Sequence, residues 1–240
     1  MKQAKSHKKV RKILPNAEFV TIAAHQLRTP LIGLKWSLEI LSSGEAGKLN
    51  PDQKQIISKA SVATSHMLSL VNDLLNVGQI AEGSFGVILK KQSILPVFKN
   101  LKDSFKNIGD EKKVVFKFEI PPDLPPLNVD IEKMEMAINN IFDNAIKYSS
   151  SGDRVELEVA CNDHELVISI KDMGIGIPKE EFGKIFTKFF RSSRALHHHA
   201  DGTGLGLYVS KNIIEQHQGK IWFESKENQG TTFFVLLPVP

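Results

Sequence analysis

The sequence predicts two folded domains, an α-helical hairpin followed by an α/β sandwich. Apolar residues first recur with helical spacing, a glycine-containing stretch then interrupts that pattern, and the remainder alternates strand-like and helical runs. With 240 residues, of which 41% are hydrophobic and 24% charged, the chain is long enough for two ordinary domains. We expect a helical domain over residues 16–80 and an α/β domain over residues 87–240, joined by a linker at residues 81–86.

The first predicted helix carries a regular apolar seam, formed by Val20, Ala24, Leu27, Leu31, Leu34, Leu38 and Leu41. These positions alternate steps of four and three residues, which is typical of a helix that packs against other helices. His25 directly follows a seam residue, so we expect it beside the buried stripe and facing solvent. Pro30 removes a backbone hydrogen bond and is expected to bend the helix just beyond the histidine.

A second helix follows the helix-breaking Gly44 and Gly47, since Asn50 and Pro51 suit its N-cap and first turn. Its seam is formed by Ile56, Ala60, Ala63, Met67, Leu70, Leu74 and Val77. Two helices that each bury one stripe make a small core, so two hairpins are expected to pair as a dimeric four-helix bundle. The sequence therefore predicts a homodimer.

The remainder of the chain has the order of an α/β sandwich. Strands are expected at residues 87–91, 114–120, 154–161, 165–171, 220–225 and 231–237. Helices are expected near residues 95–108, 130–148 and 205–218.

Charge and cysteine content exclude several function classes. The net charge of +4 is concentrated in residues 1–15, which form a basic juxtamembrane segment, a linker or a solvated tail. The rest is near neutral, which argues against nucleic-acid binding. Because Cys161 is the single cysteine, no intramolecular disulfide is possible and a cytoplasmic location is expected. No run approaches the roughly eighteen apolar residues of a membrane span.

Two motifs point to phosphate chemistry. The first is the run His25-Gln26-Leu27-Arg28-Thr29-Pro30, whose neutral imidazole is a competent nucleophile near pH 7. The second is the helical face of Asn140, Asn144 and Lys147, which offers amide oxygens suited to Mg²⁺ and an ammonium suited to phosphate.

Two glycine-rich loops complete the candidate site. Asp172 precedes Gly174 and Gly176, which let the backbone approach a ligand closely. The run from Gly202 to Gly206 leads directly into a helix whose free N–H groups suit phosphate. This run lacks the lysine and hydroxyl pair of a P-loop.

A lid is expected between these two loops. Phe186, Phe189 and Phe190 are expected to anchor its base, and Arg191 or Arg194 to reach phosphate when the lid closes. His197–His199 suggest either a metal site or a solvated loop. We favour the loop, because three adjacent histidines cannot easily point at one ion.

In this order the motifs resemble the sensor histidine kinases of two-component signalling, from Phe19 onward. The histidine run is similar to their phosphoacceptor box, usually H-E-L-R-T-P, and the asparagine helix is similar to their N box. The α/β part resembles the ATP-binding fold shared with type II topoisomerases, Hsp90-class chaperones and MutL-type repair proteins.

The resemblance implies that ATP and Mg²⁺ are the ligands of the α/β domain. Asn144 would hold the metal with support from Asn140, Lys147 would meet phosphate, and Asp172 would bind the adenine amino group near Tyr148. The full set of implied nucleotide-binding residues is Asn140, Asn144, Lys147, Tyr148, Asp172, Gly174, Gly176, Ile177, Phe190, Arg191, Gly202, Thr203, Gly204, Leu205, Gly206 and Leu207.

The implied function is ATP-dependent autophosphorylation of His25, followed by transfer to an aspartate of a response regulator receiver domain. The implied catalytic residues are His25, Gln26, Arg28, Thr29 and Pro30. Gln26 stands where many relatives have an acid. It cannot act as a general base but can still hydrogen-bond the imidazole, so we expect activity. Gln26 and Thr29 also match positions that orient water for dephosphorylation of the regulator. Relatives often carry membrane helices upstream, which would anchor the full-length protein in the inner membrane.

Two other functions remain open. One is an ATP-driven conformational clamp without a phosphohistidine, against which the histidine run argues. The other is a non-catalytic dimeric scaffold or a regulator phosphatase. The stimulus, the cognate regulator and cis or trans transfer are not determined by the sequence.

Overall fold

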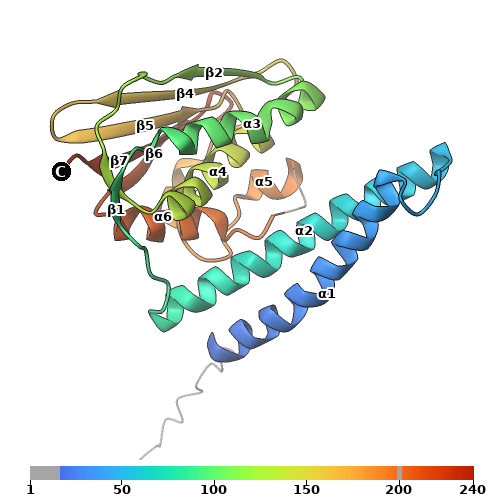
Figure 1. Cartoon of the computed structure of the whole chain (residues 1–240). Helices are drawn as coiled ribbons and strands as arrows, with labels where there is room; N and C mark the ends of the chain where they lie inside the picture. The colour runs from blue at the N-terminus through green and yellow to red at the C-terminus, as the bar shows by residue number, and fades with distance from the viewer. Residues whose placement is uncertain (1–16, 199–201) are drawn as a thin grey trace, which may run out of the picture. The chain divides into compact units, whose positions relative to one another are not determined.

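The computed structural model describes residues 17–198 and 202–240, so the basic segment of residues 1–15 and His199 lie outside the described residues. The chain divides between Ser84 and Phe85 into two compact units, here called the hairpin unit and the α/β unit (Figure 1). Within the described ranges, none of the helices combines the length and apolar character needed to cross a membrane.

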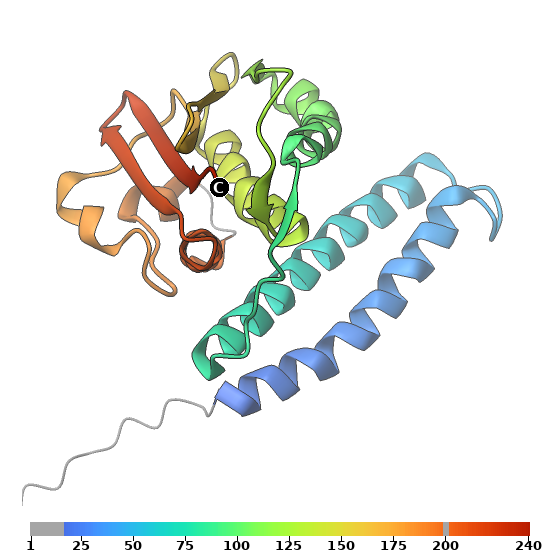
Figure 2. The same cartoon turned by 60° about the vertical axis from the view of Figure 1, so that its left-hand side comes forward.

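The hairpin unit consists of helices α1 (Ala17–Ser43) and α2 (Pro51–Glu82), which run side by side in opposite directions (Figures 1 and 2). Helix α1 is continuous through Pro30. Helix α2 begins with a capping box, in which the Asn50 side chain accepts from the Gln53 amide at 2.8 Å and the Gln53 side chain accepts from the Asn50 amide at 3.0 Å. These bonds satisfy two of the backbone donors left free at a helix start.

The seam of the hairpin is only partly buried in one chain. Ala24, Val71 and Leu75 form its core, with Leu31 and Leu74 packed against them. Other seam residues remain exposed in the single chain, with exposed fractions of 52% for Leu27, 45% for Leu34, 66% for Ile56 and 41% for Met67. One hairpin therefore leaves a large part of its apolar stripe in contact with water.

Helix α2 extends into the segment expected as a linker, because it continues to Glu82 and is capped by Gly83 in the left-handed conformation with φ 70°. The next residues are also held. The Ser84 amide donates to the Gln79 carbonyl at 2.9 Å, and Phe85 is buried with the Lys133 ammonium 4.2 Å from its ring centre. Ser84 and Phe85 of the expected linker are therefore each held by a contact within their own unit.

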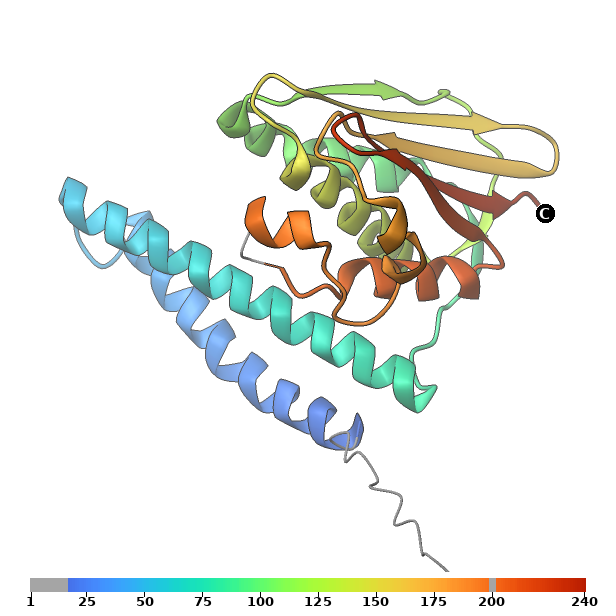
Figure 3. The same ribbon diagram turned by 180° about the vertical axis from the view of Figure 1, so that it is seen from behind.

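The α/β unit contains a five-stranded sheet in the order β2-β4-β5-β7-β6. Its strands are β2 (Val115–Glu119), β4 (Arg154–Cys161), β5 (Glu165–Lys171), β6 (Lys220–Lys226) and β7 (Gly230–Pro238). The β2–β4 pair is parallel and the other pairs are antiparallel. Helices α3 (Leu95–Lys112), α4 (Ile131–Tyr148) and α6 (Gly206–Gln216) lie on one face of the sheet (Figures 1 and 3).

Helix α4 lies at the centre of the core. Its Phe142 ring packs against Phe105 at 5.2 Å, Phe116 at 5.3 Å and Phe118 at 5.7 Å between ring centres. Inward-facing residues of β4 and β5 alternate with exposed ones, as expected for a sheet covered on one face. Because one face of α4 is fixed in this way, its opposite polar face is held in a defined direction.

Several short elements were not predicted. The strand expected at residues 87–91 is instead β1 (Lys90–Gln92), because its antiparallel partner β3 (Leu127–Val129) is equally short. A 3₁₀ helix, η1 (Lys179–Lys184), and a helix, α5 (Ser193–His198), lie between the two glycine-rich loops.

Candidate functional site

His25 lies on helix α1 with its side chain exposed, directly after the buried Ala24. This agrees with its predicted place beside the seam. Arg28 and Thr29 follow three and four residues later, so they share its face of the helix. Gln26 and Thr29 are also exposed. An exposed imidazole on a helix is accessible to a phosphoryl donor.

Arg28 is bound across the hairpin. Its Nε donates to the Asn72 side-chain oxygen at 3.0 Å, and its Nη2 donates to the same oxygen at 2.5 Å. A guanidinium has five N–H donors, so this contact orients Arg28 and leaves donors for a phosphate near His25. The sequence offered no signal for Asn72, because the pairing depends on how the two helices pack.

The polar face of α4 meets the start of α6. The Asn140 amide nitrogen donates to the Gly206 carbonyl at 3.4 Å, and a Cβ built on Gly206 would lie 3.5 Å from the Asn140 Cγ. The Ser210 hydroxyl fixes the same approach, since it donates to the Ala137 carbonyl at 3.2 Å. The asparagine face of α4 and the glycine run at residues 202–206, which is predicted to bind phosphate, are therefore neighbours.

Asn144 and Lys147 differ in their surroundings. Among the described residues, no hydrogen bond or ion pair engages the half-buried Asn144 side chain. The Lys147 ammonium instead pairs with the Asp143 carboxylate at 2.5 Å. Both charged side chains are more than a third exposed, so this pair is weak and an incoming phosphate can compete for the lysine.

Asp172 is the buried acid of the site, with an exposed fraction of 5%. One carboxylate oxygen, Oδ1, accepts from the Gly174 amide at 2.9 Å and from the Thr231 amide at 3.1 Å. Burial raises the pKa of the Asp172 carboxyl from 3.8 to about 6, although these two hydrogen bonds favour the ionised form. The second oxygen, Oδ2, accepts none of these bonds and is available to a ligand donor.

The loop after Asp172 requires its glycines. A Cβ on Gly174 would collide with the Tyr148 carbonyl, and a Cβ on Gly176 would collide with the Lys226 backbone. Gly176 also has φ 65°, which disfavours other residues. The Ile177 amide donates to the Ser225 hydroxyl at 2.8 Å. The loop is thus fixed between the end of α4 and the end of β6.

The second glycine run forms the entry to α6. Gly204 has φ 66° and lies against the backbone of Phe189 and Phe190, where a Cβ would clash. The Thr203 hydroxyl accepts from the amide of the buried Leu205 at 3.1 Å. The half-buried Leu207 lies in the first turn of α6. Free N–H groups of such a first turn attract phosphate.

The aromatic base of the lid is only partly as predicted. Phe186 packs against Phe223 at 5.9 Å and Phe233 at 6.4 Å between ring centres, as an anchor should. Phe189 was wrongly predicted as an anchor, because its side chain is 63% exposed. Of the histidine run, His197 and His198 belong to α5, and His199 lies outside the described residues.

The donor set fits a bound Mg²⁺ better than an all-protein metal cage. Within residues 17–198 and 202–240, no cluster of three or more His, Cys, Asp or Glu side chains is placed to hold a metal ion. Mg²⁺ commonly keeps several waters and bridges substrate phosphates, so one free amide oxygen at Asn144 suits it. Thr231 was missed as a site neighbour, because only its long-range contact with Asp172 reveals it. Asp143 was also missed, although it lies four residues before Lys147 on the same helix.

Two families match most of the chain. Residues 16–83 match the family described as the His Kinase A (phospho-acceptor) domain. Residues 129–240 match the family described as Histidine kinase-, DNA gyrase B-, and HSP90-like ATPase. The first match contains His25, and the second contains every residue implied to bind nucleotide.

Similar proteins carry both parts. The chain is 38% identical over 225 residues to the sensor protein kinase WalK of Staphylococcus saprophyticus, and 38% identical over 223 residues to a WalK of Staphylococcus aureus. These matches cover 92% of this chain but only 36% and 53% of the relatives, so the chain spans about a third to a half of their length. The structure of full-length ShkA in complex with AMPPNP covers 93% of this chain and 46% of its own, with a TM-score of 0.72 and 23% identity, a likeness of fold.

Proposed function

This chain belongs to the sensor histidine kinases, because it joins a phosphoacceptor domain to an ATPase domain of that family, and from that premise we propose that it phosphorylates His25 from ATP and passes the phosphoryl group to a response regulator aspartate. One observation carries the proposal for the nucleotide site. The loop after Asp172 and the glycine entry to α6, far apart in sequence, each contact the N-box helix α4 in the α/β unit.

The proposed nucleotide pose follows from the chemistry of these groups. The free Oδ2 of Asp172 accepts from the exocyclic amine of adenine, and the first turn of α6 donates backbone N–H groups to phosphate. Asn144 would hold Mg²⁺, which when bound would offset the charge on the phosphate oxygens. Lys147 exchanges its partner Asp143 for a phosphate oxygen, since their exposed ion pair is weak.

The proposed chemical step is an in-line displacement at phosphorus. An unprotonated imidazole nitrogen of His25 attacks the γ-phosphorus, the new P–N bond forms, and the bond to the β,γ-bridging oxygen breaks to release ADP. The ring proton passes to solvent or substrate, because the Gln26 amide cannot accept it. Positioning and charge neutralisation supply most of the rate enhancement in such reactions.

The assembly and partners belong to the same proposal. Exposed Leu27, Leu34, Ile56 and Met67 provide the stripe along which two hairpins would pair as a four-helix bundle. The receiver domain would approach the exposed face of His25, where Gln26 and Thr29 would serve a regulator phosphatase activity. The proposal includes a phosphoacceptor domain over residues 16–80, a nucleotide-binding domain over residues 87–240 and a cytoplasmic place of action.

Labelling with γ-labelled ATP tests the proposal. Wild type should gain a label that is labile to acid and stable to base, whereas His25→Gln should gain none while its thermal stabilisation by Mg²⁺·ADP stays near wild type. His164→Gln, an exposed histidine of the α/β unit, is the matched control and should label normally.

Three outcomes separate the alternatives. Label retained by His25→Gln would identify a different phosphoacceptor. ATP hydrolysis by wild type without any label would favour a conformational clamp. Nucleotide binding with neither label nor hydrolysis would favour the scaffold.

A further inference from the structure

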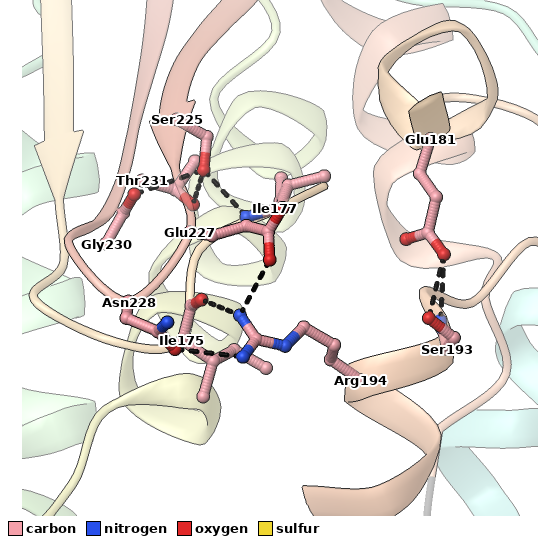
Figure 4. A network of polar contacts seen from close by, with 10 residues as sticks. All are labelled: Ile175, Ile177, Glu181, Ser193, Arg194, Ser225, Glu227, Asn228, Gly230 and Thr231. Atoms are coloured by element: carbon pink, nitrogen blue, oxygen red, sulfur yellow. Dashed lines mark hydrogen bonds and ion pairs between the residues drawn. The ribbon is translucent and has the colours of Figure 1, made fainter. Parts of the chain in front are cut away.

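Arg194 of helix α5 is turned toward the loop that follows Asp172 (Figure 4). Its Nη1 donates to the Ile175 carbonyl at 3.0 Å, and its Nη2 donates to the Asn228 side-chain oxygen at 2.9 Å. Nη1 also lies 3.6 Å from a Glu227 carboxylate oxygen. The guanidinium thus links helix α5 to the loop that follows Asp172 and to the turn between β6 and β7.

The Ile175 carbonyl is shared by two donors. It also accepts from the Asn228 backbone amide at 2.9 Å, in the turn between β6 and β7. Asn228 has φ 58°, a conformation that asparagine and glycine tolerate best. The Ile175 carbonyl, between Gly174 and Gly176, therefore joins the loop that follows Asp172 to the β6–β7 turn and to helix α5.

A second contact holds the start of the same helix. The Glu181 carboxylate accepts from the Ser193 amide at 3.2 Å and from the Ser193 hydroxyl at 3.0 Å (Figure 4). Helix α5 is thus attached through Ser193 to η1 and through Arg194 to the loop that follows Asp172. This arrangement does not direct Arg194 toward phosphate.

The hydrogen bonds of Arg194, rather than its ion pair, fix this geometry. The Glu227 carboxylate is 51% exposed and Arg194 33%, and exposed pairs contribute little. Hydrogen bonds from a charged donor to a carbonyl or amide oxygen are stronger than neutral ones. Arg191 remains the arginine beside the phosphate loop, since a Cβ on Gly202 would lie 3.4 Å from its guanidinium carbon.

We propose that Arg194 is a positioning residue that holds the loop following Asp172 in place through the Ile175 carbonyl. In this role it sets nucleotide affinity rather than the rate of phosphoryl transfer. This inference rests on the proposed nucleotide site. The adenine base is the same in substrate, transition state and ADP. A looser loop therefore weakens the binding of all three equally. Such uniform loss of binding raises KM and leaves kcat unchanged.

Steady-state labelling and calorimetric titration with Mg²⁺·ADP, both on the full chain, test this division. In Arg194→Ala the dissociation constant for ADP and the KM for ATP should each rise about tenfold, while kcat should stay within about twofold of wild type. Arg194→Lys should recover part of the affinity, because one ammonium can still donate to the Ile175 carbonyl. Arg154→Ala, which removes an exposed arginine of β4 paired with Glu156, is the matched control and should change neither constant.

Asn228→Gly keeps the backbone bond to Ile175 and the positive φ while removing one acceptor of Arg194. It should raise the dissociation constant for ADP, and adding it to Arg194→Ala should cost little more, because both changes break one contact. It also provides a second test if Arg194→Ala proves unstable.

A fall of about tenfold or more in kcat with unchanged ADP affinity would assign Arg194 to phosphate and overturn the inference. Unchanged constants in both Arg194→Ala and Asn228→Gly would also overturn it. Failure of wild type to label would instead reject the proposed kinase function, and the ADP titration would still decide the role of Arg194.

Discussion

Replacing Asp172 by asparagine should stabilise the α/β unit while weakening nucleotide binding, because the same buried carboxylate opposes folding and is available to the ligand. The change conserves the shape of the side chain. The Oδ1 position can still accept from the Gly174 and Thr231 amides. The negative charge is lost, and the Oδ2 position becomes an NH₂ donor.

The expected gain follows from the raised pKa. In the folded chain the pKa of this carboxyl rises from 3.8 to about 6, and one pKa unit corresponds to about 1.4 kcal/mol, so ionisation of Asp172 opposes folding by about 3 kcal/mol above pH 6. The folded state binds this proton more tightly than the unfolded state does. The penalty is therefore absent below about pH 3.8, grows as the pH rises to about 6, and is constant beyond.

Urea unfolding of wild type and Asp172→Asn near pH 5 and pH 7.5 measures this penalty. The advantage of the variant in free energy of unfolding should be larger at pH 7.5 than at pH 5 by about 1.5 kcal/mol. The change in this advantage between the two pH values is a better test than the advantage at either pH alone. Burial of the new NH₂ group adds a cost to the variant that does not depend on pH and cancels in the difference. Asp123→Asn removes a charge from an exposed loop residue and should show no such difference.

Binding should change in the opposite direction. The adenine amine would meet an NH₂ group in place of a carboxylate oxygen, so affinity for Mg²⁺·ADP should fall by about tenfold or more. A variant that is no more stable than wild type at pH 7.5, with an advantage that does not vary with pH, would refute the reasoning about burial. Unchanged ADP affinity would refute the ligand role of Asp172.

Other changes address the remaining parts of the proposal. Asn144→Ala should keep its thermal stability without ligand and lose the part of the ADP-induced thermal shift that requires Mg²⁺; an unchanged magnesium dependence would remove Asn144 as the metal ligand. Gln26→Glu should label His25 at a rate similar to or above wild type, because a carboxylate can orient the ring and raise its nucleophilicity; a fall of about a hundredfold in single-turnover labelling, or about 2.7 kcal/mol, would show that the glutamine is required. Leu34→Glu should convert a dimer to monomers in sedimentation equilibrium, whereas Lys35→Glu on the exposed side of α1 should not.

The elements with strong periodicity were predictable from the sequence. The helix expected at residues 130–148 is α4 (Ile131–Tyr148), and the strands expected at residues 154–161 and 165–171 are β4 and β5 with the same bounds. A long amphipathic helix and alternating strands record their buried face in local order. Strand β3 has three residues, and its pairing with β1 depends on a partner distant in the sequence.

The composition of the candidate site was predictable, whereas its contacts were not. Motif spacing identified His25, Asn140, Asn144 and Asp172 as candidates, because their chemistry is carried by residue type and helical or loop position. The same spacing is silent about partners that come from other elements.

The sequence by itself determined the two-part organisation, the main helices and strands, and the residue types offered for phosphate chemistry. The tertiary structure alone decided that Thr231 binds Asp172, that Arg28 binds Asn72, and that Arg194 faces Ile175 instead of phosphate. It also decided that Phe189 is exposed. Periodicity depends on neighbours within a few residues along the chain, whereas these contacts join segments that meet only when helices and strands pack. An arginine on a short helix such as α5 can reach several acceptors, and packing selects among them.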